Sequence, residues 1–335
     1  MRLVVQIPCL NEEETLPAVL ESIPRQIPGI DDIIVLVIDD GSDDSTVEVA
    51  RRFGVIEFVH HSRNQGLGRS FHDGVVRALE LGADIVVNTD GDNQYPQERI
   101  TDLVQPIVRA EADIVIADRQ VALVEHFSVL KKQLQRFGSG VVSRAAGTRL
   151  PDAASGFRAY SRESLMLLNT ITRFSFAMET IIQAGNKNLE IASIPVVTNA
   201  KTRESRLFSS MPEHVAKSAG AIIRSYMMYK PYVIFTWLTL VFGVLGLIPF
   251  VRYAVLMAQE QSGGHVQSLL VGALLLIMAS MSAMLGVVAD LIRTNRILIE
   301  NNLEHTKRVR FGRSGTEMRR DRSSRTEFDS PQTSS

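Results

Sequence analysis

The stretch "DIVVNTDGDNQYP", residues 84–96, joins an apolar run to a turn that carries two acids. Ile85–Asn88 is short and apolar, which is typical of a strand buried on both faces of a parallel sheet. Asp90 and Asp92 follow directly, and Gly91 between them allows the backbone to turn. Two carboxylates held so close repel each other unless a cation lies between them. The stretch therefore predicts a buried strand that ends at a binding site.

The first 200 residues repeat this arrangement of apolar strands separated by amphipathic stretches. The predicted strands are Leu3–Ile7, Ile33–Ile38, Ile56–His60, Ile85–Asn88 and Ile114–Ala117. The predicted helices lie near Glu13–Ile23, Ser45–Phe53, Gly68–Leu81 and Ile100–Ala110. This alternation predicts an α/β fold, with a mainly parallel sheet covered by helices on both faces. Ligands of such sheets bind beyond the carboxyl ends of the strands, where the acids lie.

The bulk composition narrows the classes of protein. The chain has 335 residues, of which 45% are hydrophobic and 22% charged, so it can bury a large core. Its net charge of -1 argues against a nucleic-acid partner. The single cysteine, Cys9, excludes an internal disulfide and fits a reducing compartment. The first residues, "MRLVVQIPCLNEEE", lack the pattern of a signal peptide, and we expect none.

The acid pairs indicate the chemistry of the site. In "VIDDGSDDST", residues 37–46, turn and cap preferences explain residues 41–45, but not the two acids before them. A carboxylate there can accept hydrogen bonds from a base or a ribose. Asp90 and Asp92 suit a hard cation, Mg²⁺ or Mn²⁺, that keeps positions open for phosphate oxygens. Gln94 can add a neutral oxygen.

A glycine-rich stretch, "RNQGLGRS" at residues 63–70, precedes a predicted helix. It is not the dinucleotide fingerprint, because Phe71 stands where the third glycine belongs and the stretch does not follow the first strand. An oxidoreductase is therefore disfavoured. A close approach of the backbone to a nucleotide and a plain helix start both remain open.

Two long apolar segments, Tyr232–Met257 and Ser268–Ile292, predict a transmembrane hairpin within residues 231–293. The alternative, a pair of buried core helices, lacks an amphipathic face. The linker Ala258–Gln267 has no Lys or Arg, whereas basic residues flank both outer ends, so the positive-inside rule places both termini in the cytosol at a plasma (inner) membrane. Residues 211–230 are expected to form an amphipathic helix in the interface. Residues 294–335 are expected to form a cytosolic tail, disordered from about 312.

Five motifs together resemble glycosyltransferase family 2, of the GT-A fold, over about residues 1–210. They are "IPCLNEEE" (7–14), "VIDDGSDDST" (37–46), "TDGDNQ" (89–94), "DAASGFRAYSRE" (152–163) and "TRESRL" (202–207). The last two are similar to the acceptor motif and the basic loop of the polyprenyl-phosphate branch, which includes dolichol-phosphate mannose synthases. The resemblance implies a Rossmann-like mixed sheet, an interfacial helix and two transmembrane helices.

The resemblance also implies an inverting transfer of one sugar from a UDP- or GDP-linked donor to polyprenyl phosphate. It assigns nucleotide-sugar binding to Pro8, Leu10, Glu12, Ile38, Asp40, Asp90, Gly91 and Arg119. It assigns acceptor or diphosphate binding to Arg158, Ser155, Arg203 and Arg206. It assigns the metal, Mg²⁺ or Mn²⁺, to Asp92, Gln94 and Asp90. It assigns catalysis to Asp152, Asp92 and Arg158.

Rival functions remain open at this point. A processive polysaccharide synthase requires a QxxRW motif, which the sequence lacks, because Trp237 follows Phe235 and Thr236 in the first apolar segment. A glycosyltransferase acting on a hydroxyl of another lipid or glycan needs a general base, whereas a phosphate acceptor is already largely anionic. A membrane scaffold that only binds nucleotide-sugars is the non-enzyme alternative. A homo-oligomer is compatible with the sequence, and neither the sugar nor the nucleotide is identified by it.

Overall fold

The computed structural model describes residues 1–120, 139–140, 142–143, 146–147, 151–170, 176–199, 231–259 and 266–312. Four predictions fall outside the described residues. They concern Arg203, Arg206, the amphipathic helix at 211–230 and the tail beyond residue 312.

The described part of the chain forms a seven-stranded sheet in the order β3-β2-β1-β4-β6-β5-β7. The strands are β1 (Arg2–Cys9), β2 (Asp32–Asp39), β3 (Glu57–His60), β4 (Ile85–Asn88), β5 (Ile114–Asp118), β6 (Arg158–Ser161) and β7 (Ile191–Pro195). Neighbouring strands are parallel except β6, which is antiparallel to both β4 and β5. The expected mixed α/β sheet is confirmed, and β6 and β7 are strands that the sequence pattern did not predict.

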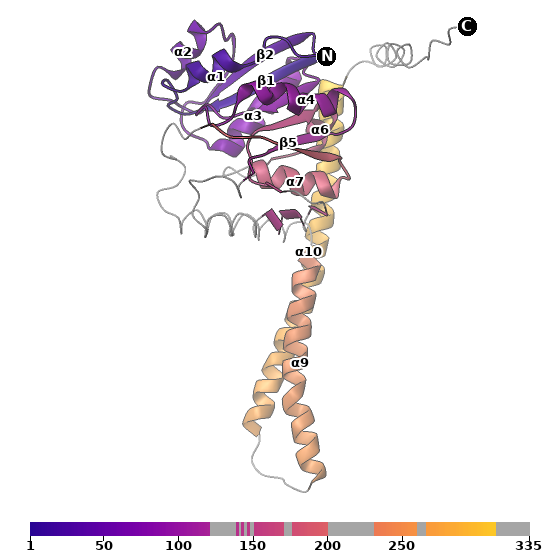
Figure 1. The fold of residues 1–335 in the computed structure, drawn as a ribbon. Helices are drawn as coiled ribbons and strands as arrows, with labels where there is room; N and C mark the ends of the chain where they lie inside the picture. Colours follow the sequence, from indigo (N-terminus) through magenta and orange to yellow (C-terminus); the bar gives the residue numbers. More distant parts are fainter. Residues whose placement is uncertain are drawn as a thin grey trace, which may run out of the picture.

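Helices cover both faces of this sheet (Figure 1). They are α1 (Leu16–Ser22), α2 (Thr46–Arg52), α3 (Leu67–Glu80), the 3₁₀ turn η1 (Gln97–Arg99), α4 (Ile100–Val108), α6 (Arg162–Leu167) and α7 (Phe176–Asn186). In α3, helical spacing places Phe71, Val75 and Ala78 on one buried face. The four predicted helices are all present, with ends that differ by at most three residues from those expected.

Two hydrophobic layers, one on each face of the sheet, form the core. Side chains alternate along β1, so Val4 packs with α3 and α7 while Leu3 and Val5 pack with α1 and α4. Phe71 and Phe176 stack with ring centroids 4.0 Å apart in the first layer. Because β1 is buried on both faces, its sequence is a nearly continuous apolar run.

Arg158 of β6 is a charged residue inside this core, with no exposed surface. Its Nε donates to the carbonyl of Ser155 at 2.7 Å, and Nη2 donates to that of Ala153 at 2.9 Å. Its Nη1 donates to the carbonyl of Ala177 at 2.7 Å and to Thr180 Oγ1 at 3.1 Å. The guanidinium therefore ties the segment before β6 to α7. This geometry does not support the predicted catalytic and phosphate-binding role, and we assign Arg158 a structural one.

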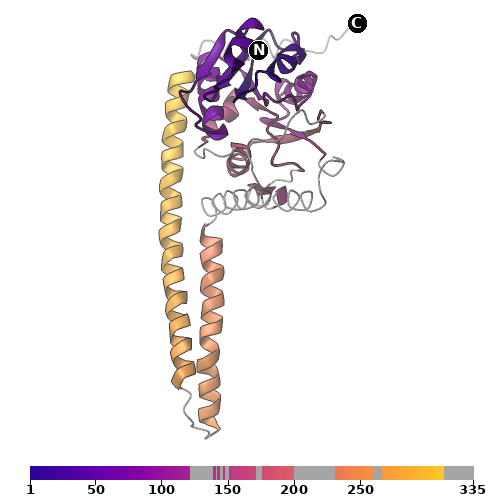
Figure 2. The same cartoon turned by 90° about the vertical axis from the view of Figure 1, so that its left-hand side faces the viewer.

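The two apolar segments form long helices, α9 (Pro231–Ala258) and α10 (Val266–Phe311), which pack as a hairpin that projects from the α/β domain (Figures 1 and 2). Both are long and apolar enough to cross a membrane. Large side chains such as Trp237, Leu245 and Leu285 are more than 45% exposed. The alternative of buried core helices is therefore wrong for the described residues.

The helix α10 does not end with the apolar segment at Ile292 but continues to Phe311. Figures 1 and 2 show its last part running alongside the α/β domain to the domain's far end. There it contacts α6, and its last residues line an open groove together with the starts of β1 and β2. The first part of the expected tail is thus helical.

Replacing Arg158 with Met removes the donors to three main-chain carbonyls and leaves them buried without these partners. Each unpaired buried polar group costs about 1–3 kcal/mol, so the free energy of unfolding should fall by about 3 kcal/mol or more. Urea denaturation followed by circular dichroism measures this change. The exposed Arg109 supplies the control, since Arg109→Met should change stability by less than about 0.5 kcal/mol. Equal stability of the two variants would contradict the structural role.

Candidate active site

The candidate site lies at the carboxyl edge of the sheet, which is the end where β1, β2, β4 and β5 finish. Cys9 pairs with Asp39 in register, so the loops after β1 and β2 leave the sheet side by side. Because β6 is antiparallel, its first residue, Arg158, pairs with Asn88, the last residue of β4. The segment before β6 therefore reaches the same edge as the Asp90–Asp92 turn.

The acid turn after β4 is held in a defined shape. The main-chain N–H of Gln94 donates to Asp92 Oδ1 at 3.1 Å, and its side-chain Nε2 donates to Asp92 Oδ2 at 2.7 Å. Asn93 between them has a left-handed φ of 58°. In this arrangement Gln94 orients the Asp92 carboxylate. Its role as a metal ligand stays a prediction.

Asp90 lies against Gly156 from the segment before β6. A Cβ at position 156 would approach both Asp90 oxygens to 3.3 Å, so the missing side chain leaves room for the carboxylate. Burial raises the pKa of Asp90 to about 7, and the neighbouring Asp92 adds to the shift while Arg119 opposes it. The turn therefore holds two half-buried carboxyl groups so close together that each disfavours ionisation of the other.

This donor set fits a hard divalent cation. It offers only oxygens, and a cation would relieve the repulsion between Asp90 and Asp92. The described residues contain no group of three or more His, Cys, Asp or Glu side chains that could hold a metal. A cation held here would have few protein ligands, which suits Mg²⁺ or Mn²⁺ completed by substrate oxygens and water.

Asp152, in the segment before β6, forms an ion pair with Arg119 through two hydrogen bonds. Arg119 Nε donates to Asp152 Oδ2 at 2.6 Å, and Arg119 Nη2 donates to Oδ1 at 3.0 Å. Burial of Asp152, which is 2% exposed, opposes its ionisation, but the Arg119 charge and hydrogen bonds outweigh burial and hold its pKa below the usual range. Asp152 is therefore a weak proton acceptor.

The loops after β1 and β2 place the residues predicted to bind the nucleotide. Pro8 and Leu10 are half-buried, and Glu12 is buried next to the acid turn. Thr15 Oγ1 donates to Glu12 Oε2 and to the carbonyl of Gly91, both at 2.8 Å, so the loop after β1 is joined to the acid turn after β4.

Two predicted nucleotide contacts face the protein instead. The Asp40 oxygens accept from the main-chain N–H groups of Gln65 and Gly66, both at 2.9 Å, and from the His61 ring at 2.7 Å. Asp40 thus fixes the glycine-rich loop. The side chain of Ile38 is fully buried in the core, so only its main chain could contact a ligand. These placements do not support direct side-chain roles for Asp40 and Ile38.

Gly41 is required where these loops meet. Its φ is +82°, and a Cβ there would approach the main chain of Arg63 to 2.8 Å.

Ser155, predicted to contact the acceptor, is fully buried, and its hydroxyl has no hydrogen-bond partner among the described residues.

Tyr95 is a residue of the site that the sequence analysis did not single out. Its hydroxyl accepts from the main-chain N–H of Gly156 at 3.1 Å, and its ring packs on Phe157 with centroids 5.1 Å apart. Asn88 Nδ2 donates to the carbonyl of Gly156 at 3.0 Å. The sequence offered one indication that Asn88 belongs to the site: it is a polar residue at the end of an apolar strand.

Cys9 lies beside the acid turn, with its Sγ 3.1 Å from the position of a Cβ at Gly91. It is 2% exposed. Burial, followed by the charges of Glu12 and Asp39, raises the pKa of its thiol well above the usual value.

Comparison with known proteins agrees with this geometry. The family model "Glycosyl transferase family 2" matches residues 4–168. The dolichyl-phosphate hexose transferase of Haloferax volcanii is 30% identical over 213 residues, which are 61% of this chain and 86% of that protein. The polyprenol monophosphomannose synthase of Mycolicibacterium smegmatis is 25% identical, covering 68% of this chain and 84% of that protein.

A solved structure supports the fold. Glucosyl-3-phosphoglycerate synthase from Mycobacterium tuberculosis, in complex with UDP, superposes with a TM-score of 0.52 at 22% identity, over 67% of this chain and 80% of that one. At this identity the likeness concerns the fold alone. The family model and the Haloferax volcanii protein, of which this chain covers 86%, show that the chain belongs to glycosyl transferase family 2.

Proposed function

We propose that this glycosyltransferase moves one sugar from a UDP- or GDP-linked donor to polyprenyl phosphate, with inversion at the anomeric carbon. The relatives named above act on dolichyl and polyprenyl phosphates. The observation that carries the proposal is the ion pair between Asp152 and Arg119 beside the acid turn.

This ion pair favours a phosphate acceptor over a hydroxyl. A hydroxyl nucleophile needs a strong general base, and Asp152 is a poor one because Arg119 stabilises its ionised form. A phosphate monoester carries most of its negative charge at neutral pH, since its second pKa is about 6. It can therefore attack without giving up a proton. Asp152 then serves to hold Arg119 in place near the acceptor.

On the donor side, Asp92 and Asp90 would hold Mg²⁺ or Mn²⁺, with Gln94 fixing the Asp92 carboxylate. When bound, such a cation would offset the negative charge of the departing nucleotide diphosphate. The loop fixed by Asp40 and the one joined through Thr15 would form the walls of the nucleotide site.

We also propose that α9 and α10 anchor the enzyme in a plasma membrane, with the α/β domain and both termini in the cytosol. Their exposed apolar side chains and the lack of Lys and Arg in residues 258–267 support this placement. Anchoring next to a lipid acceptor raises the acceptor's effective concentration.

The two carboxylates of the site should respond differently to substitution. Asp92→Ala should lower transfer by roughly 1,000-fold, because it removes a ligand of the cation. Asp152→Asn should lower it by less than about 100-fold, because no strong base is lost. Transfer of radiolabelled sugar to polyprenyl phosphate measures both.

The pH profile separates the acceptor classes. With a phosphate acceptor, the transfer rate of Asp152→Asn should depend on pH in the same way as that of the wild-type enzyme.

Complete inactivity of Asp152→Asn, with Arg119 still in place, would instead indicate that Asp152 is a general base and that the acceptor is a hydroxyl. Binding of the nucleotide-sugar without any lipid product, across UDP- and GDP-linked donors, would indicate the scaffold alternative.

Chelation should abolish transfer, and added Mg²⁺ or Mn²⁺ should restore it. Binding of Mn²⁺ alone, followed by calorimetry, gives a readout that does not depend on turnover. Asp92→Ala should eliminate this binding, while the core variant Ile38→Val should keep it, because the Ile38 side chain is buried in the core layer of α3 and α7. Full activity in excess chelator would contradict metal dependence.

A further inference from the structure

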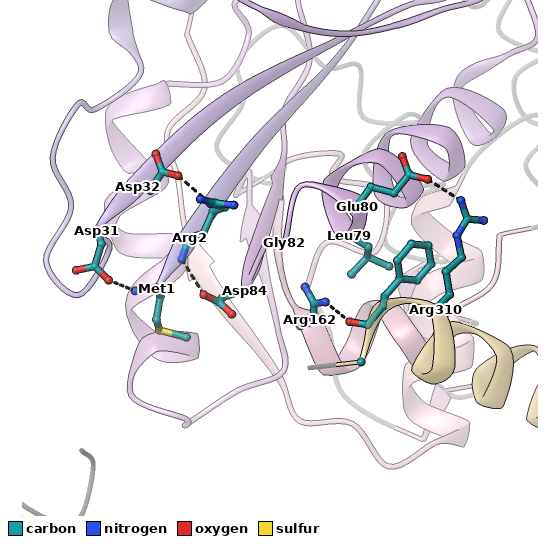
Figure 3. A pocket seen from close by; sticks show the side chains of 12 residues that line it. Met1, Arg2, Asp31, Asp32, Leu79, Glu80, Gly82, Asp84, Arg162 and Arg310 are labelled. Carbon is teal, nitrogen blue, oxygen red and sulfur yellow. Dashed lines mark hydrogen bonds and ion pairs between the residues drawn. The ribbon is translucent and has the colours of Figure 1, made fainter. Parts of the chain in front are cut away.

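The part of α10 beyond the apolar segment, residues 293–311, is called the strut here. Its far end docks at the amino edge of the sheet, opposite the candidate site. Figure 3 shows this region, an open groove of about 790 Å³, where Arg310 meets Glu80 of α3 at 2.7 Å. Arg162 donates to the carbonyl of Phe311 and also to that of Ala83.

A half-buried lysine, Lys307, and a buried phenylalanine, Phe311, fix the strut to the domain. Lys307 Nζ donates to the carbonyls of Leu168 at 2.6 Å and Leu165 at 3.2 Å, which are main-chain groups at the end of α6. The last carbonyls of a helix generally lack partners within it, so the lysine acts as a cap at the end of α6. The ring of Phe311 is 9% exposed and belongs to the core layer of α3 and α7.

The strut is built to be stiff. Sequence positions 293–311 contain neither proline nor glycine. Arg296 pairs with Glu300 at 2.7 Å and Arg308 with Glu304 at 3.0 Å, both one helical turn apart. At about 1.5 Å per residue, the strut spans roughly 27 Å between the apolar segment and its far end.

We propose that the strut is a positioning element that sets the distance between the bilayer and the carboxyl-edge site. This inference rests on the proposed function, because only an acceptor held in a membrane makes that distance matter. A stiff helix docked at one edge of the sheet fixes how far the opposite edge stands from the lipid. The phosphate of a membrane-bound acceptor can then meet the Arg119–Asp152 pair, whereas a soluble acceptor reaches it from any direction.

The test changes the length of the strut without changing its docking face. Seven helix-forming residues inserted between Asn295 and Arg296 lengthen it by about 10 Å and two turns, so the same side still faces α6. Transfer is measured to C55 polyprenyl phosphate in nanodiscs and to a water-soluble C10 polyprenyl phosphate. The ratio of long-chain to short-chain activity should fall by about tenfold or more, because the effective concentration of the membrane acceptor drops.

Two further variants complete the design. The same insert placed after Gly312, beyond the docked end, should leave the ratio at the wild-type value. Lys307→Met combined with Phe311→Ala frees the far end and should lower the ratio as the insertion does. Donor binding by each variant checks that the α/β domain is folded.

The outcomes separate the two proposals. An unchanged ratio in the lengthened enzyme, or equal losses with both acceptors, would overturn the positioning role while the proposed function stands. A wild-type enzyme that transfers sugar to neither phosphate would overturn the proposed function and the strut's role with it.

Discussion

The pairing of β6 with β4 is the constraint on which the candidate site depends. β6 runs antiparallel to both β4 and β5 in a sheet whose other pairs are parallel, so the chain turns back at the edge where β4 ends. Gly156 is thereby set against Asp90, and Asp152 is brought to Arg119 at the end of β5. The buried guanidinium of Arg158 holds the segment before β6 in place by donating to the carbonyls of Ser155 and Ala153. A charged side chain that faces away from the site therefore helps to build it.

The site combines two carboxylate environments. In the acid turn, burial and Asp92 raise the pKa of Asp90, and the nearby Arg119 opposes this shift only in part. Asp152, by contrast, forms a direct ion pair with Arg119. A family 2 glycosyltransferase with these two environments has carboxylates to hold a cation with a diphosphate, while the carboxylate beside Arg119 takes up a proton poorly. This asymmetry is the physical reason to connect the fold with an acceptor that is already anionic.

Sequence patterns predicted the elements that depend on local periodicity. The strands up to β5, the first four helices and the acid turn follow from apolar runs and turn residues. The sequence patterns did not predict the direction in which side chains point. Arg158, Asp40 and Ile38 lie in motifs next to the site, but each side chain points into the protein. A motif shows which residues are near a site, whereas burial depends on partners far away in the sequence. The short, arginine-containing β6 and the docking of Lys307 depend on such partners too, so no local pattern indicated them.

The burial of Cys9 has a practical consequence. Thiol reagents attack the thiolate, and the only cysteine of the chain is both enclosed and surrounded by acids that disfavour that form. The native protein should therefore react very little with maleimide reagents. A spin label or fluorophore attached through a single introduced cysteine would report on one chosen position, with the neighbourhood of the acid turn left intact.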